Sequence, residues 1–183
     1  VVLFTPLSRV GSEVARHREY NRFEKLATTP LRRWEWLAAQ TLVNVGIIGV
    51  AAAGILLLVV AVTGASIVFS PLLVPFVVLG VALFCGLGAI LGSLSDSSDG
   101  VIAASNGIAL PLLFLSETFV TPDLLPAWFR PALALSPLTY VARGIRAVTY
   151  PEATTTALPN LLVVAVLAAV FFVAGAYAVP RTE

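Results

Sequence analysis

The sequence predicts an all-α integral membrane protein, and two observations carry that prediction. First, 58% of the residues are hydrophobic and 11% are charged, whereas soluble domains have about 25% charged residues. Second, the apolar residues gather in long uninterrupted runs, while most of the basic residues gather in one segment near the start. With 183 residues, the chain has room for four or five spans of about 20 residues and for little else.

The apolar runs predict four complete transmembrane helices. Their ranges are 37–63, 72–93, 101–115 and 158–179. The third run is short and contains Ser105, Asn106 and Pro111, so it needs protein neighbours to satisfy its polar groups. Residues 37–183 therefore form the predicted transmembrane domain.

The first ten residues, VVLFTPLSRV, are apolar but too short to span a bilayer. They also lack the basic start and the small-residue cleavage site of a signal peptide. We interpret them as the end of a preceding span. On this interpretation, residues 1–36 comprise that end and a cytoplasmic loop.

The basic residues predict the orientation, because Lys and Arg are retained on the cytoplasmic side. Eight of the eleven fall inside if the 1–36 segment is cytoplasmic, and three, Arg130, Arg143 and Arg146, fall outside. The segment 117–150 then lies outside. Its prolines divide it into pieces too short to span, which predicts two short re-entrant or interfacial helices before the last span. Arg143 and Arg146 are expected to face water or headgroups.

The segment from Glu13 to Lys25 alternates in charge and has a modest apolar side, which predicts a surface helix. Pro30 then indicates a break before the next helix, and Trp34 and Trp36 fall where that helix enters the membrane. One interpretation is a solvated anchor that contacts only lipid headgroups. The other is a helix that docks on a partner protein.

The string HREYNRFEKLATTPLRRWEWL, residues 17–37, resembles the cytoplasmic loop of ABC-2 type transporter permeases. The later string LPLLFLSETFVTPDLLPAWFRPALALSPLTYVARGIRAV, residues 110–148, is similar to the segment before the last span of that family. The two motifs occur in the expected order. Through residues 114–122 the similarity is greatest to the daunorubicin-type, drug-resistance branch.

The resemblance implies the membrane subunit of an ATP-driven exporter in the cytoplasmic (inner) membrane of a prokaryotic cell. Such a subunit pairs with a second permease copy and with separate ABC ATPase subunits, which hold ATP and Mg²⁺. In agreement, the chain has no P-loop of its own, because its one lysine, Lys25, follows Glu24 and not a glycine. No cofactor is expected in this chain. The family normally has six spans, so this chain supplies the end of the second and the last four.

The resemblance also implies which residues act. On this resemblance, Glu13 to Thr29 is the coupling helix, which would dock on the ATPase and transmit its closure to the spans. The residues implied in that coupling are Glu19, Phe23, Glu24, Lys25, Leu26, Thr29 and Pro30. The candidates for the transport pathway or its outer gate are Asn44, Asn106, Glu117, Trp128 and Tyr140. The chain departs from the family pattern at Asn21, Arg22 and Glu117, where the family favours Gly-Thr and a small or amide residue.

The sequence weighs against other classes. An HExxH metalloprotease needs two histidines and an intramembrane serine protease needs one within the bilayer, but the only histidine, His17, is in the charged segment. A net charge of +1 indicates no nucleic-acid partner. A non-transporting scaffold or assembly factor stays open as an alternative, and so does a permease for polysaccharide export. The apolar runs suit a hydrophobic drug or lipid as cargo, but a bilayer alone requires such runs.

Two polar or small-residue features carry more than one interpretation. Gly88 and Gly92 permit close helix approach, either within the chain or at a dimer seam. Asn44 and Asn106 lie within spans, where they either line a pathway or form an interhelical hydrogen bond.

Overall fold

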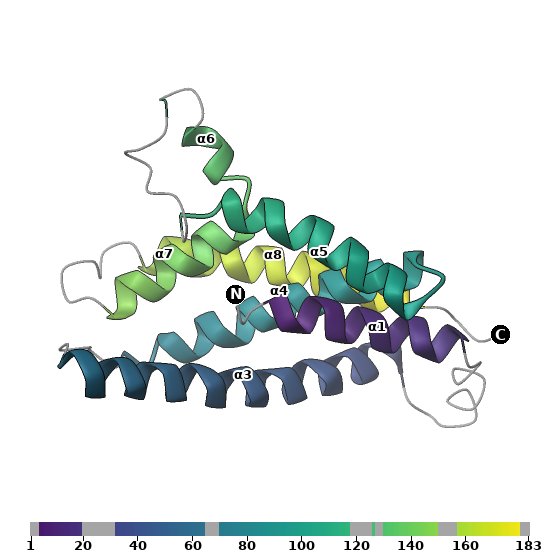
Figure 1. The fold of residues 1–183 in the computed structure, drawn as a ribbon, viewed down its shortest axis with the longest axis horizontal. Helices are drawn as coiled ribbons and strands as arrows, with labels where there is room; N and C mark the ends of the chain where they lie inside the picture. Colours follow the sequence, from purple (N-terminus) through teal and green to yellow (C-terminus); the bar gives the residue numbers. More distant parts are fainter. Residues whose placement is uncertain are drawn as a thin grey trace.

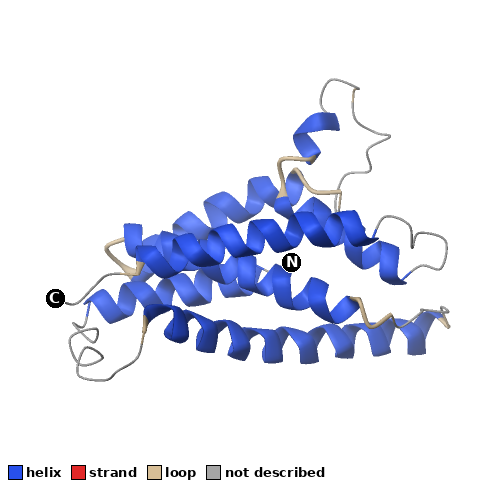
Figure 2. Ribbon diagram, turned by 180° about the vertical axis from the view of Figure 1, so that it is seen from behind, coloured by secondary structure: helices blue, strands red, loops and turns tan. Residues whose placement is uncertain are grey.

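The computed structural model describes residues 4–19, 32–64, 70–117, 126, 130–149 and 157–179. These residues form helices and short connections, with no strand among them (Figures 1 and 2). The helices are α1 (Thr5–Glu19), α3 (Arg33–Thr63), α4 (Leu73–Leu94), α5 (Ser98–Phe114), α6 (Arg130–Leu133), α7 (Pro137–Thr149) and α8 (Ala157–Ala178). The all-α fold class predicted from the sequence is therefore confirmed for the described part of the chain.

Local sequence signals place several helix ends. At the start of α3, the Arg32 backbone N–H donates to the Glu35 carboxylate at 2.8 Å, as in a capping box. At its end, Gly64 has a left-handed φ of 63° and its N–H donates to the Val60 carbonyl at 2.9 Å. Ser97 caps α5 by accepting from the Gly100 N–H at 3.1 Å.

The helix α4 is the centre of the bundle and packs against α1, α3, α5, α7 and α8. Small residues allow its backbone to approach two neighbours closely. A Cβ atom on Gly88 would lie 2.5 Å from the Leu7 carbonyl oxygen of α1, and one on Gly175 of α8 would lie 2.6 Å from that of Gly86. Of the two interpretations of Gly88, packing within the chain is thus the one observed. A dimer seam is not needed to explain this glycine.

By contrast, α3 lies along one side of the bundle (Figure 1). Its buried residues are Leu37, Thr41, Asn44 and Ile48. Their spacing of three and four residues makes one stripe, which ends halfway along the helix. Leu37 and Ile48 join a core cluster with Val10 and Val14 of α1 and with residues of α4.

Three helices, α3, α4 and α8, are long and apolar enough to cross a membrane. The helix α5 is also apolar, but it has 17 residues and contains Pro111, which places it at the lower limit for a span. The helices follow the predicted apolar runs to within a few residues. The fourth complete span, at α5, stays a prediction.

The first helix differs from the prediction. The sequence predicts the end of a span in the first ten residues and a separate surface helix from Glu13. In the structure, α1 runs without a break from Thr5 to Glu19. The reason is that its apolar face continues past Glu13. Leu7, Val10 and Val14 are fully buried, on one helical face that packs against α4. The rest of the predicted surface helix lies outside the described residues.

The predicted outer segment contains α6, which is a single turn, and α7, which packs on α8 and α4. The first predicted short helix, around residues 124–129, is outside the described residues except for Pro126. The second corresponds to α7, whose apolar face is buried and whose arginines are half exposed.

Candidate functional site

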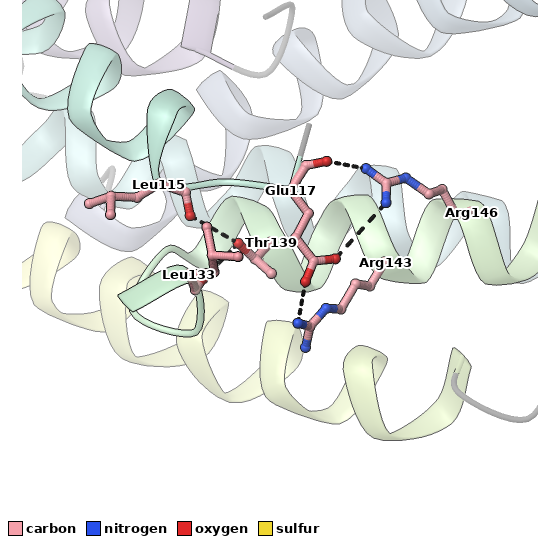
Figure 3. Close-up of polar contacts among 6 residues, drawn as sticks. All are labelled: Leu115, Glu117, Leu133, Thr139, Arg143 and Arg146. Carbon is pink, nitrogen blue, oxygen red and sulfur yellow. Dashed lines mark hydrogen bonds and ion pairs between the residues drawn. The ribbon is translucent and has the colours of Figure 1, made fainter. Parts of the chain in front are cut away.

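The densest group of polar contacts lies where the end of α5 meets α7 (Figure 3). We call it the α5–α7 junction. Its residues are Ser116, Glu117, Ser136, Thr139, Arg143 and Arg146. The first four are buried. Buried polar groups are costly unless they are hydrogen-bonded, so the partners of each one determine what the junction does.

Glu117 is paired with two arginines of α7. The Arg143 guanidinium donates to one carboxylate oxygen, while Arg146 lies 3.9 Å from the other and also donates to the Glu117 backbone carbonyl. The Glu117 side chain is 7% exposed and the two arginine side chains are 42% and 48% exposed. The hydrogen bond that Arg143 donates to Glu117 raises the pKa of this arginine above its usual value.

The hydroxyl groups of the junction satisfy carbonyls at the end of α5. The last carbonyls of a helix have no partner within it. Here Ser136 donates to the Leu112 carbonyl at 2.9 Å, and Ser116 donates to that of Leu113 at 2.7 Å. Thr139 donates to the Leu133 carbonyl at 2.7 Å and lies 3.5 Å from that of Leu115. The start of α7 is therefore joined to the end of α5 through side chains.

Apolar packing fixes α7 from its other side. Gly144 lies directly against the Phe76 ring of α4, so any side chain there would clash with the ring. Phe76 also clusters with Val141, Val148 and Val164 of α7 and α8. Thus α7 has an apolar face on α4 and α8 and a cationic face on Glu117.

Chemically, this arrangement is a charged latch between helices. A charge-assisted hydrogen bond is about twice as strong as a neutral one. Breaking it would leave the buried Glu117 carboxylate without that cationic partner. No group of three or more metal-ligating side chains occurs among the residues that the structure describes. The junction therefore holds α7 against the end of α5.

The predicted pathway and gate residues that the structure describes lie on several elements. Glu117 is at the junction, and Tyr140 is half buried on α7 beside it. Asn44 is buried on α3, where its amide donates to the Gln40 carbonyl of the same helix at 2.8 Å. Asn106 is exposed on α5. Trp128 lies outside the described residues.

Most of the predicted coupling residues also lie outside the described part of the chain. The helix α1 ends at Glu19, whose side chain is not described, and Phe23, Glu24, Lys25, Leu26, Thr29 and Pro30 all precede the next described residue, Arg32. What the structure does give is the attachment of this segment. His17 of α1 and Trp36 of α3 have ring centroids 5.7 Å apart. The end of α1 therefore lies beside the start of α3.

Sequence reasoning did not find the pairing of Glu117 with Arg143 and Arg146, because it assigned both arginines to water or headgroups. A usable signal was present. The two arginines are three residues apart, which places them on one helical face, and Glu117 is the one acidic residue at the end of the preceding apolar run.

These features define the class: a multi-pass integral membrane protein whose described residues form helices. The comparisons then give the family. The ABC-2 type transporter family model matches residues 1–150, so the chain belongs to this family. It is a permease component of an ABC transporter and not the ATP-hydrolysing component. No curated protein and no solved structure matches the chain.

Proposed function

We propose that this permease exports a hydrophobic drug, a lipid or a similar compound across the cytoplasmic membrane, driven by ATP hydrolysed in a separate ABC ATPase subunit. The observation that carries the proposal is the family match from α1 through α7, because ABC-2 permeases in general work with an ABC ATPase. The similarity of residues 114–122 to the drug-resistance branch supports drug export over polysaccharide export. ATP and Mg²⁺ bind the partner, and a second permease copy completes the pathway.

Coupling to the ATPase is assigned to residues 19–30. Support comes from the described helices on either side of this segment. The preceding helix, α1, is buried against α4 and α5, and the following helix, α3, meets α1 through Trp36 and His17. A displacement of the segment would therefore reach the core of the bundle by two routes. Discrete packing of this kind transmits movement because packed helices do not deform continuously.

Reversal of one charge in the segment tests the coupling. We expect Glu24→Arg to leave membrane insertion unchanged and to reduce ATP-driven export by about tenfold or more, because one charge outside the apolar runs adds little to a membrane fold but can specify a partner. The measurement is uptake of daunorubicin into inside-out vesicles that contain the permease and an ABC ATPase that copurifies with it. ATP hydrolysis is followed in the same vesicles.

Asp96→Arg is the matched control, because it makes the same charge change in the exposed connection between α4 and α5. Normal uptake with Glu24→Arg would contradict the coupling role and favour the interpretation of this segment as a lipid anchor. Absence of any nucleotide-dependent association with an ATPase would favour a non-transporting scaffold.

The α5–α7 junction is assigned to the outer gate. Its support is that Glu117, at the end of α5, is held by two arginines of a helix that otherwise rests on α4 and α8. If this latch closes the outer end of the transport pathway, weakening it would let exported cargo return through the permease. We expect Glu117→Gln to shift the latch about tenfold towards the open state, since a hydrogen bond to a charged group is worth about 1.5–3 kcal/mol.

In the same vesicles, Glu117→Gln should lower net daunorubicin uptake while ATP hydrolysis continues at its normal rate. The charge swap Glu117→Arg with Arg143→Glu should restore part of the uptake. Equal losses of uptake and hydrolysis, with no rescue by the swap, would show that the junction only supports the fold.

A further inference from the structure

The exposed face of α5 carries a polar side chain in the middle of the helix. The helix packs against α1 and α4 and buries Val101 and Ser105, whereas Asn106 is exposed. Asn106 is the ninth of the 17 residues of α5, so it lies about 12 Å from either end. Since α5 follows α4 after a short connection and returns along the bundle (Figure 1), Asn106 is well inside the bilayer if α5 crosses it as predicted.

The exposed faces of two other long helices carry no such group. The exposed residues of α3 from Leu42 to Val62 are all apolar, and so are those of α8 from Leu158 to Ala174. Faces of this kind suit the acyl chains of lipids. An amide that meets hydrocarbon is costly, because its donors and its acceptor have nothing to bond. The exposed face of α5 therefore needs a polar partner that the described residues do not supply.

The residues around Asn106 form a seam of the kind found between paired helices. Ala103, Asn106 and Leu110 are exposed and are spaced by three and four residues, which is the spacing of a coiled-coil seam. Beside them, Gly107 has nothing within 4 Å of the place of a Cβ atom, so a second helix can approach closely. Asp99 continues the seam into the first turn of α5, where water reaches the helix end. A single amide among apolar residues suits a packed contact better than a water-filled channel.

A second copy of α5 satisfies this amide. An asparagine side chain contains both donors and an acceptor. Around a two-fold axis the same residue of each copy faces the other, so each Asn106 amide can donate to its counterpart. Because both copies insert with the same orientation, the two α5 helices run parallel. In parallel coiled coils, one asparagine in an apolar seam specifies the register and the number of helices.

We propose that two copies of this chain pair through the exposed face of α5, with reciprocal hydrogen bonds between their Asn106 amides. Ala103, Gly107 and Leu110 form the surrounding packed contact. This inference deepens the proposed function, because it assigns the contact with the second permease copy to one helix face. It rests on that function for the presence of a second copy, and on the prediction that α5 crosses the membrane.

Disulfide formation between copies tests the contact in lipid vesicles that contain the full chain. The background variant is Cys85→Ala, which removes the only cysteine. On oxidation with copper phenanthroline, Ala103→Cys should form a covalent dimer. The matched control is Ala53→Cys, because Ala53 is an exposed alanine on α3. We expect crosslinking at position 103 to be at least about tenfold faster, since a disulfide requires Cα atoms within about 7 Å.

The role of the amide is tested by energy transfer between copies that carry donor and acceptor dyes at their C-termini. In detergent, Asn106→Leu should weaken association about eightfold, because it removes two hydrogen bonds that average about 0.6 kcal/mol each. Asn106→Gln keeps an amide and should restore part of the association. Asn44→Leu is the matched control, because the Asn44 amide is bonded within its own helix, and it should leave association unchanged.

Equal crosslinking at positions 103 and 53 would overturn the proposal, and so would unchanged association of Asn106→Leu. Ready reaction of Ala103→Cys with a water-soluble maleimide, without a crosslink, would also overturn it, since α5 would then line a water-filled pathway. If Asn106→Leu does not fold, the crosslink at position 103 decides, because that variant keeps Asn106. Neither measurement uses an ATPase or a cargo, so failure here is distinct from failure of daunorubicin export.

Discussion

The helices α3 and α4 are similar in hydropathy, but they are buried to very different extents. Their most apolar stretches have mean hydropathies of 2.9 and 2.5, yet 6% of that stretch is buried in α3 and 50% in α4. Both contain several glycines. In α4, Gly86, Gly88 and Gly92 meet the backbones of α8 and α1. The glycines of α3 at positions 46, 49 and 54 instead have open space where a side chain would stand.

This difference shows what hydropathy measures. A bilayer is as apolar as a leucine side chain, so residence in the membrane does not require a helix to be buried in protein. Helix association there depends on close packing and on hydrogen bonds between helices. The helix α4 is central because its small residues match the surfaces of its neighbours. Beyond Ile48, most of α3 offers exposed side chains to lipid or to a partner.

The largest expected effect comes from a side chain placed at a backbone crossing. Gly88→Leu should destabilise the bundle by at least about 3 kcal/mol, because its Cβ would meet the Leu7 carbonyl and backbone cannot move aside as a side chain can. Reversible unfolding in mixed detergent micelles measures the change.

The matched variant is Gly54→Leu in α3, where nothing lies within 4 Å of the new Cβ. It should be neutral or stabilising by up to about 1 kcal/mol, because glycine is a poor helix former. Similar destabilisation by both variants would break the contrast between the two helices.

A smaller effect is expected from the stripe that attaches the first half of α3. Leu37 is fully buried against α1 and α4, so Leu37→Ala should cost about 2 kcal/mol. This value is at the low end of the range for soluble cores. In a membrane, the substitution loses the packing contacts of the leucine, but the transfer of apolar surface from water contributes little.

Leu57 is 64% exposed in the second half of α3, and Leu57→Ala should change stability by less than about 0.5 kcal/mol. The same unfolding assay compares the two leucines. A loss at Leu57 as large as that at Leu37 would indicate that a partner covers the far half of α3.

The smallest expected effect is at Asn44, because its amide is already bonded within its own helix. Asn44→Leu should change stability by less than about 1 kcal/mol, close to the average of about 0.6 kcal/mol for side-chain hydrogen bonds between membrane helices. A clear loss of daunorubicin uptake by a variant of nearly unchanged stability would support the predicted pathway role. Loss of folding would instead identify Asn44 as a structural residue.

The sequence predicted the features that depend on local composition. Apolar runs identify helices that suit a bilayer because transfer into lipid is close to a sum over residues, and α3, α4 and α8 follow their runs. The resemblance in two motifs identified the family that the comparison found.

Tertiary structure decided the features that join distant segments. The spacing of Leu7, Val10 and Val14 suits one helical face, but only the contact of that face with α4 shows that α1 continues past Glu13. The pairing of Glu117 with Arg143 and Arg146 required the end of α5 to meet α7. Composition fixes which segments prefer the membrane, but only the shapes of the packed helices fix which side chains meet within it.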